Sequence, residues 1–231
     1  MLVFSYGIPK SGSTLAFELA KGVARLGGHR QPKLPAALLP GGHKVNFAQE
    51  LTAEALRGLV SAAGSRILVV KTHACPGPDW VAEYRALAAQ GLVSAHVNWR
   101  DPRDICLSLL DAGRLARSRG ERAFSEFETL EDAAAGVRRY LGEHAIWAGL
   151  PATLKLDYAT CAFRTDAAIA AIKADFGIAC PSWLVRVWVQ RFAFTYRNKA
   201  VPARHEAELM PEQAEQLRQA FAGWLPGQET V

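Results

Sequence analysis

The sequence predicts an α/β fold with a mostly parallel central sheet and helices on both faces. Three observations support this prediction. Short β-rich runs alternate along the chain with segments of helical periodicity. The strand predicted over Arg66–Val70 carries an unbroken apolar run, which is typical of a parallel strand covered on both faces. The length of 231 residues, half of them apolar, favours one large domain over residues 1–231 rather than two small ones.

The first predicted unit is a strand, a loop and a helix. The strand covers Leu2–Tyr6, and the helix covers Thr14–Leu26, where leucine and valine recur at helical spacing. The loop between them is rich in glycine and serine. This order predicts a P-loop-like strand-loop-helix at the start of the sheet.

Two further strands end in polar or charged residues. The second strand, Arg66–Val70, runs into Lys71-Thr72-His73, and the third, Leu92–Trp99, runs into Arg100. Asp101 and Pro102 follow Arg100. An aspartate at the N-cap and a proline at the first helical position predict that a helix begins there.

The remaining elements complete the predicted alternation. Thr153–Tyr158 is predicted as a fourth strand, and three further segments have helical periodicity: Leu130–Ala148, Trp183–Phe194 and Pro211–Leu225. The Pro- and Gly-rich segment Gln31–Lys44 is predicted as a surface loop. The segment Arg114–Arg122 contains four arginines and is predicted as a solvated, mobile surface.

The composition restricts the location and the partners. The net charge of +5 is spread along the chain without a long Lys/Arg run, which favours an anionic small ligand. No zinc-finger spacing or RNA-binding aromatic motif indicates a nucleic-acid partner. The four cysteines form no CxxC pair, so reduced thiols are expected (Cys75, Cys106, Cys161, Cys180). Without a signal peptide or an apolar run of about 20 residues, the sequence predicts a cytoplasmic protein with no membrane span.

The loop Gly7–Thr14 predicts an anion site. Backbone amides at a strand-to-helix turn, together with the helix dipole, bind phosphate groups. The two glycines, Gly7 and Gly12, have the spacing of the nucleoside-triphosphate loop G-x-x-x-x-G-K-[ST]. The lysine that should follow the second glycine is missing, and Lys10 lies inside the loop instead.

The position of the cations argues against a metal-dependent kinase. A kinase loop also needs Mg²⁺, which is held by the loop hydroxyl and by an acid at the end of a neighbouring strand. Here the neighbouring strands end in Lys71 and Arg100, and Asp101 is explained as a helix cap. The sequence therefore predicts that fixed side-chain charges, without a metal, neutralise the bound anion.

Three motifs resemble those of the sulfotransferases that use 3′-phosphoadenosine 5′-phosphosulfate (PAPS). Pro9–Thr14 resembles their 5′-phosphosulfate loop P-K-S-G-T-T. Lys71-Thr72-His73 resembles the K-T-H at the end of a central strand in the cytosolic branch. Arg100–Asp104, with Ser108, resembles the 3′-phosphate element R-x-P-x-D-x-x-x-S. The motifs occur in the expected order, each at a strand end, in the first half of the chain.

The resemblance implies sulfuryl transfer from PAPS, as co-substrate and without a metal, to a hydroxyl or amine of a small-molecule or glycan acceptor. His73 is the candidate base, because a neutral imidazole accepts a proton near pH 7. Lys10 would neutralise the leaving phosphate, and Lys71 would contact the sulfuryl group. The expected donor-binding residues in this half are Lys10, Ser11, Gly12, Ser13, Thr14, Arg100 and Ser108. Ser108 shares a helix face with apolar residues, which predicts that it points inward.

The second half of the chain matches the family more loosely. Tyr158 resembles the tyrosine of the adenine-proximal Y-E-D-L segment, although alanine and threonine replace the acidic pair. Arg197 and Lys199 resemble the R-K-G element, a further 3′-phosphate clamp, and one of them is expected to serve. The usual aromatic after the phosphate loop is replaced by Leu15, so Trp99 or Phe194 is expected to stack on the adenine.

Two alternatives remain at this stage. One is a P-loop kinase or other nucleotide phosphotransferase, which shares the strand-loop-helix. The other is a non-catalytic nucleotide-binding domain that keeps the fold. If His73 is structural, Glu18 is the carboxylate nearest in sequence that could act as base. The loops that would select the acceptor carry no recognisable code.

Overall fold

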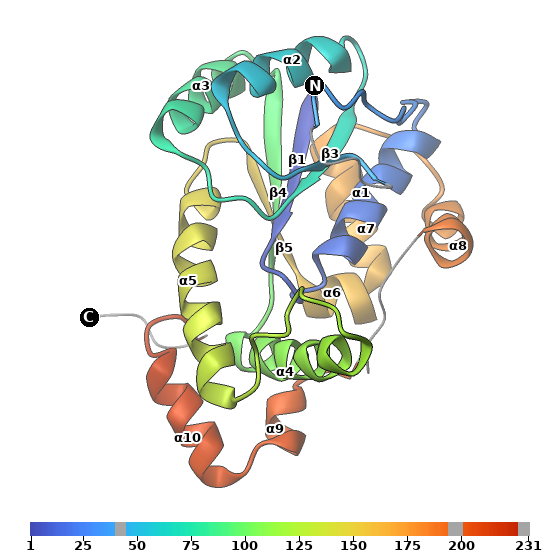
Figure 1. The fold of residues 1–231 in the computed structure, drawn as a ribbon. Coiled ribbons are helices and arrows are strands. Elements are labelled where there is room, and N and C mark those ends of the chain that lie inside the picture. Colours follow the sequence, from blue (N-terminus) through green and yellow to red (C-terminus); the bar gives the residue numbers. More distant parts are fainter. Residues whose placement is uncertain (40–44, 194–200, 226–231) are drawn as a thin grey trace.

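A computed structural model describes residues 1–39, 45–193 and 201–225, which form an α/β fold around one five-stranded sheet (Figure 1). The strands are β1 (Leu2–Gly7), β2 (Phe47–Ala48), β3 (Leu68–Thr72), β4 (Val93–Trp99) and β5 (Thr153–Asp157). The helices are α1 (Ser13–Leu26), α2 (Ala53–Ala63), α3 (Pro78–Ala89), α4 (Pro102–Arg119), α5 (Leu130–Ala148), α6 (Tyr158–Phe163), α7 (Thr165–Phe176), α8 (Ser182–Phe192), α9 (Arg204–Glu208) and α10 (Pro211–Ala220).

The strand order is β2-β3-β1-β4-β5, and every neighbouring pair is parallel. Strand β1 is central: Leu2 lies opposite Leu68 of β3 on one side and opposite Val93 of β4 on the other. Because parallel strands end at the same edge, the segments after β1, β3 and β4 meet there. The predicted parallel α/β architecture is confirmed.

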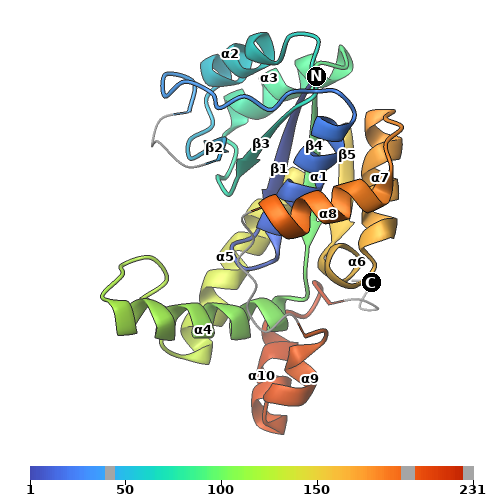
Figure 2. The same cartoon turned by 90° about the vertical axis from the view of Figure 1, so that its right-hand side faces the viewer.

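Helices cover both faces of the sheet (Figures 1 and 2). Alternate residues of β1 point to opposite faces, so Phe4 packs among residues from α2, α3 and α5, whereas Val3 packs among residues from α1, α7 and α8. Helix α4 crosses beyond the carboxyl ends of the strands, and α9 and α10 lie on its far side (Figure 2). The described part of the chain contains no helix that is both long and apolar enough to cross a bilayer.

The arginine-rich segment differs from its prediction. Residues 114–119 form the last turns of α4, which were not predicted, and Gly120 ends the helix in the left-handed region with φ 66°. Arg117 donates to the carbonyls of Ser125 and Phe127, so this side chain fastens the following loop to α4. Arg114, Arg117 and Arg119 are exposed, as predicted for a solvated surface. The helix was missed although arginine has a high helix propensity and a long side chain that can satisfy carbonyls.

Other boundaries differ by smaller amounts. Helix α10 ends at Ala220 rather than Leu225, and strand β2 and the helices α2, α3, α6, α7 and α9 were not predicted. Helix α2 does carry a start signal, since the Thr52 hydroxyl accepts a hydrogen bond from the amide of Ala55. Residues 31–39 form no helix or strand, as expected for a loop. All four cysteines are free thiols, as predicted.

Candidate functional site

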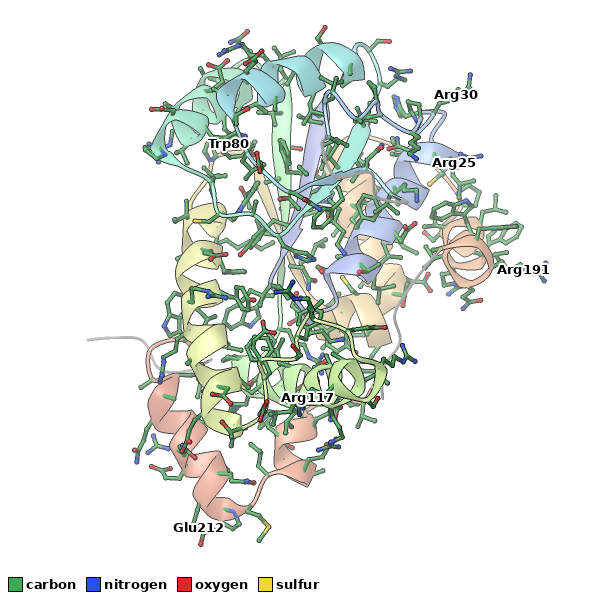
Figure 3. All side chains as sticks on the ribbon, in the orientation of Figure 1. Arg25, Arg30, Trp80, Arg117, Arg191 and Glu212 are labelled. Carbon is green, nitrogen blue, oxygen red and sulfur yellow. The ribbon has the colours of Figure 1, made fainter. Side chains whose placement is uncertain are left out.

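A cavity of about 760 Å³ lies at the carboxyl edge of the sheet. Its walls come from the loop after β1, the ends of β3 and β4, and helices α4, α6 and α8. Figure 3 shows side chains crowded between this edge and α4, where Arg117 is labelled. Ligands of open α/β sheets bind at this edge, and the volume lies in the usual range for small-molecule sites.

Two left-handed residues shape the loop between β1 and α1. Lys10 has φ 70° and Gly12 has φ 86°, and Gly12 is the N-cap of α1. The Asn98 side-chain amide donates to the Ser11 carbonyl at 2.7 Å and to the Ser11 hydroxyl at 3.1 Å. Asn98 therefore fixes the loop from the neighbouring strand. Its role was not predicted from the sequence, although a polar residue in a buried strand was an available signal.

Tyr158 and Arg100 pack against the same loop. A Cβ atom on Gly12 would lie 2.4 Å from the Tyr158 ring, so only glycine allows this close approach. The Arg100 guanidinium lies 4.2 Å from the centroid of the Tyr158 ring, and its Nη1 donates to the Lys10 carbonyl at 3.2 Å. Tyr158 was predicted to end a strand, but it is the first residue of α6. Its ring lies beside the loop, at the predicted site.

The two predicted lysines approach the loop from different elements. Lys71 Nζ donates to the Thr14 hydroxyl at 2.7 Å, and burial lowers the pKa of Lys71 to about 8. Lys10 Nζ lies 5.7 Å from the centroid of the Phe124 ring, and burial also lowers the pKa of Lys10. Both ammonium groups have lost hydration, so an anion in the cavity would stabilise their charged forms.

His73 has one defined tautomer. Its Nδ1 lies 2.5 Å from the Gly7 carbonyl oxygen, which can only accept a hydrogen bond, so Nδ1 carries the proton and Nε2 keeps its lone pair. Burial and the positive charge of Lys71 lower the pKa of His73 to about 4. The imidazole that lines this cavity is therefore neutral near pH 7.

Arg100 and Ser108 form the wall below the loop. Arg100 is 7% exposed and Ser108 is 3% exposed. Both line the cavity, so Ser108 points inward as predicted. Arg100 Nη2 lies 3.6 Å from a carboxylate oxygen of Asp104, and Nε is buried without a hydrogen-bond partner in the described structure. Because Nη1 and Nη2 make only long contacts, at 3.2 and 3.6 Å, this guanidinium keeps donor capacity for a ligand in the cavity.

Further cations, which were not predicted from the sequence, line the same cavity. Among the described lining residues, six are cationic and one, Glu121, is acidic; the cations are Lys10, Lys71, Arg100, Arg119, Arg186 and Arg204. Arg204 is 2% exposed and pairs with Asp111 and Glu208, both at 2.8 Å. The sequence signal for Arg204 was weak, because a lone arginine outside a motif is usually a surface residue.

Some predicted residues lie elsewhere or outside the described chain. Arg197, Lys199 and Phe194 belong to the segment 194–200, which the structure does not describe. Trp99 is not among the lining residues and packs edge-on against His144 at 5.2 Å, because its ring joins the core under α4 and α5. The described aromatic residues that line the cavity are Phe124, Tyr158 and Phe163.

Comparisons with known proteins give a fold but no sequence family. No family model matches the chain, and no curated protein matches it. Solved structures do match over nearly the whole chain. Retinol dehydratase in complex with androsterone and the inactive cofactor PAP aligns with a TM-score of 0.59 at 14% identity, over 100% of this chain and 82% of that chain.

A mouse sulfotransferase and a bacterial sulfotransferase domain also match the fold. The mouse sulfotransferase SULT7A1 complexed with PAP aligns with a TM-score of 0.56 at 14% identity, over 96% of this chain and 83% of that chain. The sulfotransferase domain of the Synechococcus PCC 7002 olefin synthase aligns with a TM-score of 0.51 at 16% identity, over 97% of this chain and 95% of that chain. The chain therefore has the sulfotransferase fold.

Proposed function

We propose that this protein transfers a sulfuryl group from PAPS to a hydroxyl or amine of a small-molecule or glycan acceptor. One observation carries the proposal: a neutral imidazole with a free Nε2 and three cations line one cavity around a phosphate-type loop. The imidazole is His73, and the cations are Lys10, Lys71 and Arg100. Two structures of the same fold are described as complexes with PAP, the desulfated form of this donor.

Residues from several elements around the cavity would bind the donor. The loop residues Gly12–Thr14, which line the cavity, would bind the 5′-phosphosulfate through backbone amides and hydroxyls, whereas the predicted Ser11 is fully buried, does not line the cavity and is held by Asn98. Arg100 and Ser108 would bind the 3′-phosphate, together with Arg197 or Lys199. Tyr158 would contact the adenine, since its ring already covers Gly12. Lys10 and Lys71 would meet the sulfuryl end of the donor.

The chemical step follows from these positions. His73 Nε2 takes the acceptor proton while the acceptor oxygen or nitrogen forms a bond to sulfur. The bond between sulfur and the bridging oxygen of the phosphate breaks, and its electron pair stays on the phosphate of the leaving PAP. Lys10 neutralises this developing charge, and Lys71 stabilises the equatorial oxygens of the sulfuryl group. Holding both reactants in line supplies much of the acceleration.

The residues favour this function over the kinase alternative. A P-loop phosphotransferase holds Mg²⁺ with an acid that follows a neighbouring strand. Here Lys71 lies at the end of β3 and His73 follows it, while Arg100 follows β4. We therefore propose that transfer needs no metal. The free thiols, three of them buried, agree with a reducing compartment, so we propose a cytoplasmic location.

The test compares nucleotides by thermal shift and then measures turnover. PAP should raise the midpoint of thermal unfolding more than ADP, ATP or AMP at equal concentration, because only PAP carries the 3′-phosphate that Arg100 and Ser108 would bind. PAPS with a panel of phenols, alcohols and amines should then give PAP and a sulfated product, with the rate unchanged by EDTA. Equal shifts for all four nucleotides, or a strict Mg²⁺ requirement, would overturn the proposal.

A further inference from the structure

Two neighbouring residues hold the short helix α9 against α4 (Figure 2). Oδ1 of Asp104 on α4 accepts a hydrogen bond from the backbone amide of His205 at 3.0 Å and lies 2.8 Å from His205 Nδ1. One residue earlier, Arg204 donates to Asp111 at 2.8 Å. The side chains of His205 and Asp104 are only 10% and 5% exposed, so water screens their contact little.

The two oxygens of the Asp104 carboxylate serve different elements. Oδ1 meets both His205 groups, whereas Oδ2 lies 3.6 Å from Nη2 of Arg100. A carboxylate only accepts hydrogen bonds, so Nδ1 of His205 carries a proton and both groups donate to Oδ1. Because α9 fixes Oδ1 with two donors, the carboxylate cannot turn freely, and Oδ2 stays directed at Arg100.

The spacing along α4 places these contacts beside the cavity wall. Asp104, Ser108 and Asp111 are four and three residues apart, so they share one face of the helix. Ser108 lines the cavity, and the aspartates one turn to either side of it are both held by α9. Helix α9 therefore anchors the part of α4 that would bind the 3′-phosphate together with Arg100.

We propose that His205 is a positioning residue for the donor's 3′-phosphate, which acts through Asp104 to hold the Arg100 guanidinium in its binding orientation. The inference rests on the proposed function for the identity of the ligand. The orientation of Arg100 is a property of the free protein. His205 is not among the described residues that line the cavity, so it would not touch the nucleotide itself.

Arg100 requires such a contact because its other contacts restrain it weakly. Nη1 donates to the Lys10 carbonyl at 3.2 Å, and the guanidinium lies over the Tyr158 ring, which does not fix its rotation. A ligand that must select one of many arginine rotamers binds more weakly than one that meets a guanidinium already in place. A distance of 3.6 Å is too long for a strong hydrogen bond, so Asp104 directs the guanidinium and leaves its donors for the ligand.

A purely structural role would make Asp104 only the residue that fastens α9 to α4. The two roles make different demands on its side chain. Fastening α9 needs one acceptor for His205, which the carbonyl oxygen of an asparagine also provides. Holding Arg100 needs a second acceptor, and an asparagine places an amide NH₂ group there instead.

The experiment measures the dissociation constants of PAP and AMP by calorimetric titration, because the two nucleotides differ only in the 3′-phosphate. His205→Ala should lower the preference for PAP about three- to tenfold, the weight of one hydrogen bond, and His205→Asn, whose amide can donate to Oδ1, should restore most of it. Asp104→Asn should lower the preference to a similar extent. The matched control is Gln216→Ala, which breaks a hydrogen bond from α10 to Glu131 on α5 and should leave the preference unchanged.

The outcomes separate this inference from the proposed function. A wild-type preference for PAP that is unchanged in His205→Ala and Asp104→Asn would overturn the inference. A stronger preference in Asp104→Asn would also overturn it, because the carboxylate would then only repel the phosphate. If the variants lose preference as expected but PAPS is not turned over, the inference stands and the proposed function fails. If His205→Ala does not fold, Asp104→Asn, which keeps an acceptor for His205, decides alone.

Discussion

Gly12→Ala should damage the site through two separable effects. At φ 86° any side chain is strained, and a left-handed conformation costs a non-glycine residue about 1–2 kcal/mol. The new Cβ would also lie 2.4 Å from the Tyr158 ring, where ordinary contact begins near 3.4 Å, so the ring must move by about 1 Å. Such overpacking costs about 1–3 kcal/mol, which makes the expected loss about 2–5 kcal/mol in total.

The matched control is Gly120→Ala. Gly120 has φ 66°, and no atom lies within 4 Å of its Cβ position, so only the conformational cost of about 1–2 kcal/mol applies. Urea unfolding at fixed pH measures both losses, and calorimetric titration with PAP measures the site. Because the displaced ring also covers Arg100, Gly12→Ala should weaken PAP binding, whereas Gly120→Ala should not.

A double-mutant cycle isolates the clash. In a Tyr158→Ala background the ring is gone, so Gly12→Ala should cost only the conformational term. The reasoning is refuted if Gly12→Ala costs no more than Gly120→Ala, or if its cost is the same with and without the Tyr158 ring.

Three further outcomes test the site. His73→Ala should lower turnover roughly 10²–10⁴-fold with little change in PAP affinity. In the wild type, the pKa of His73 is lowered to about 4, so kcat/KM should stay constant as the pH falls through 6.5 and decline only near pH 4. A decline of kcat/KM at about pH 6–7 would identify a different base. Arg100→Ala should weaken PAP binding by about 1.5–3 kcal/mol and remove the preference over ADP, and a retained preference would place the 3′-phosphate elsewhere. Asn98→Leu should destabilise the fold by about 1–3 kcal/mol, measured by urea unfolding, since a leucine cannot donate to Ser11; no loss of stability would contradict its role in fixing the loop.

The sequence predicted the sheet and the site residues that directly follow its strands most accurately. The parallel sheet followed from the apolar run before Lys71 and from the repeated strand-to-helix transitions. Once the strands are parallel, residues that follow them must meet at one edge, which is why the sequence alone predicts that Lys10, His73 and Arg100 share one site. The helix start at Asp101 was predicted from the aspartate and the proline that follows it. The structure confirms it, since the Asp101 side chain accepts a hydrogen bond from the amide of Arg103.

The residues that were missed depend on long-range packing. Arg204 reaches the cavity because Asp111 of α4, 93 residues earlier, holds its guanidinium. Trp99 or Phe194 was expected to stack on the adenine, but the Trp99 ring packs edge-on against His144 of α5, a contact that no local pattern reveals. The helical end of α4 after Arg114 was missed, because charge alone does not show that Arg117 donates to the carbonyls of the loop that follows. Such contacts are set by tertiary structure, not by periodicity.

The central place of β1 has a consequence for how the chain folds. Leu2 of β1 lies opposite Leu68 and Val93, so β1 can pair only with strands that come more than 60 residues later in the chain. Such distant pairings raise the contact order and slow folding. During synthesis, the anion loop emerges early but acquires its neighbours only after β4 has left the ribosome. The loop should therefore acquire its full set of neighbours late in folding, because Asn98, Arg100 and Tyr158 all belong to segments made long after it.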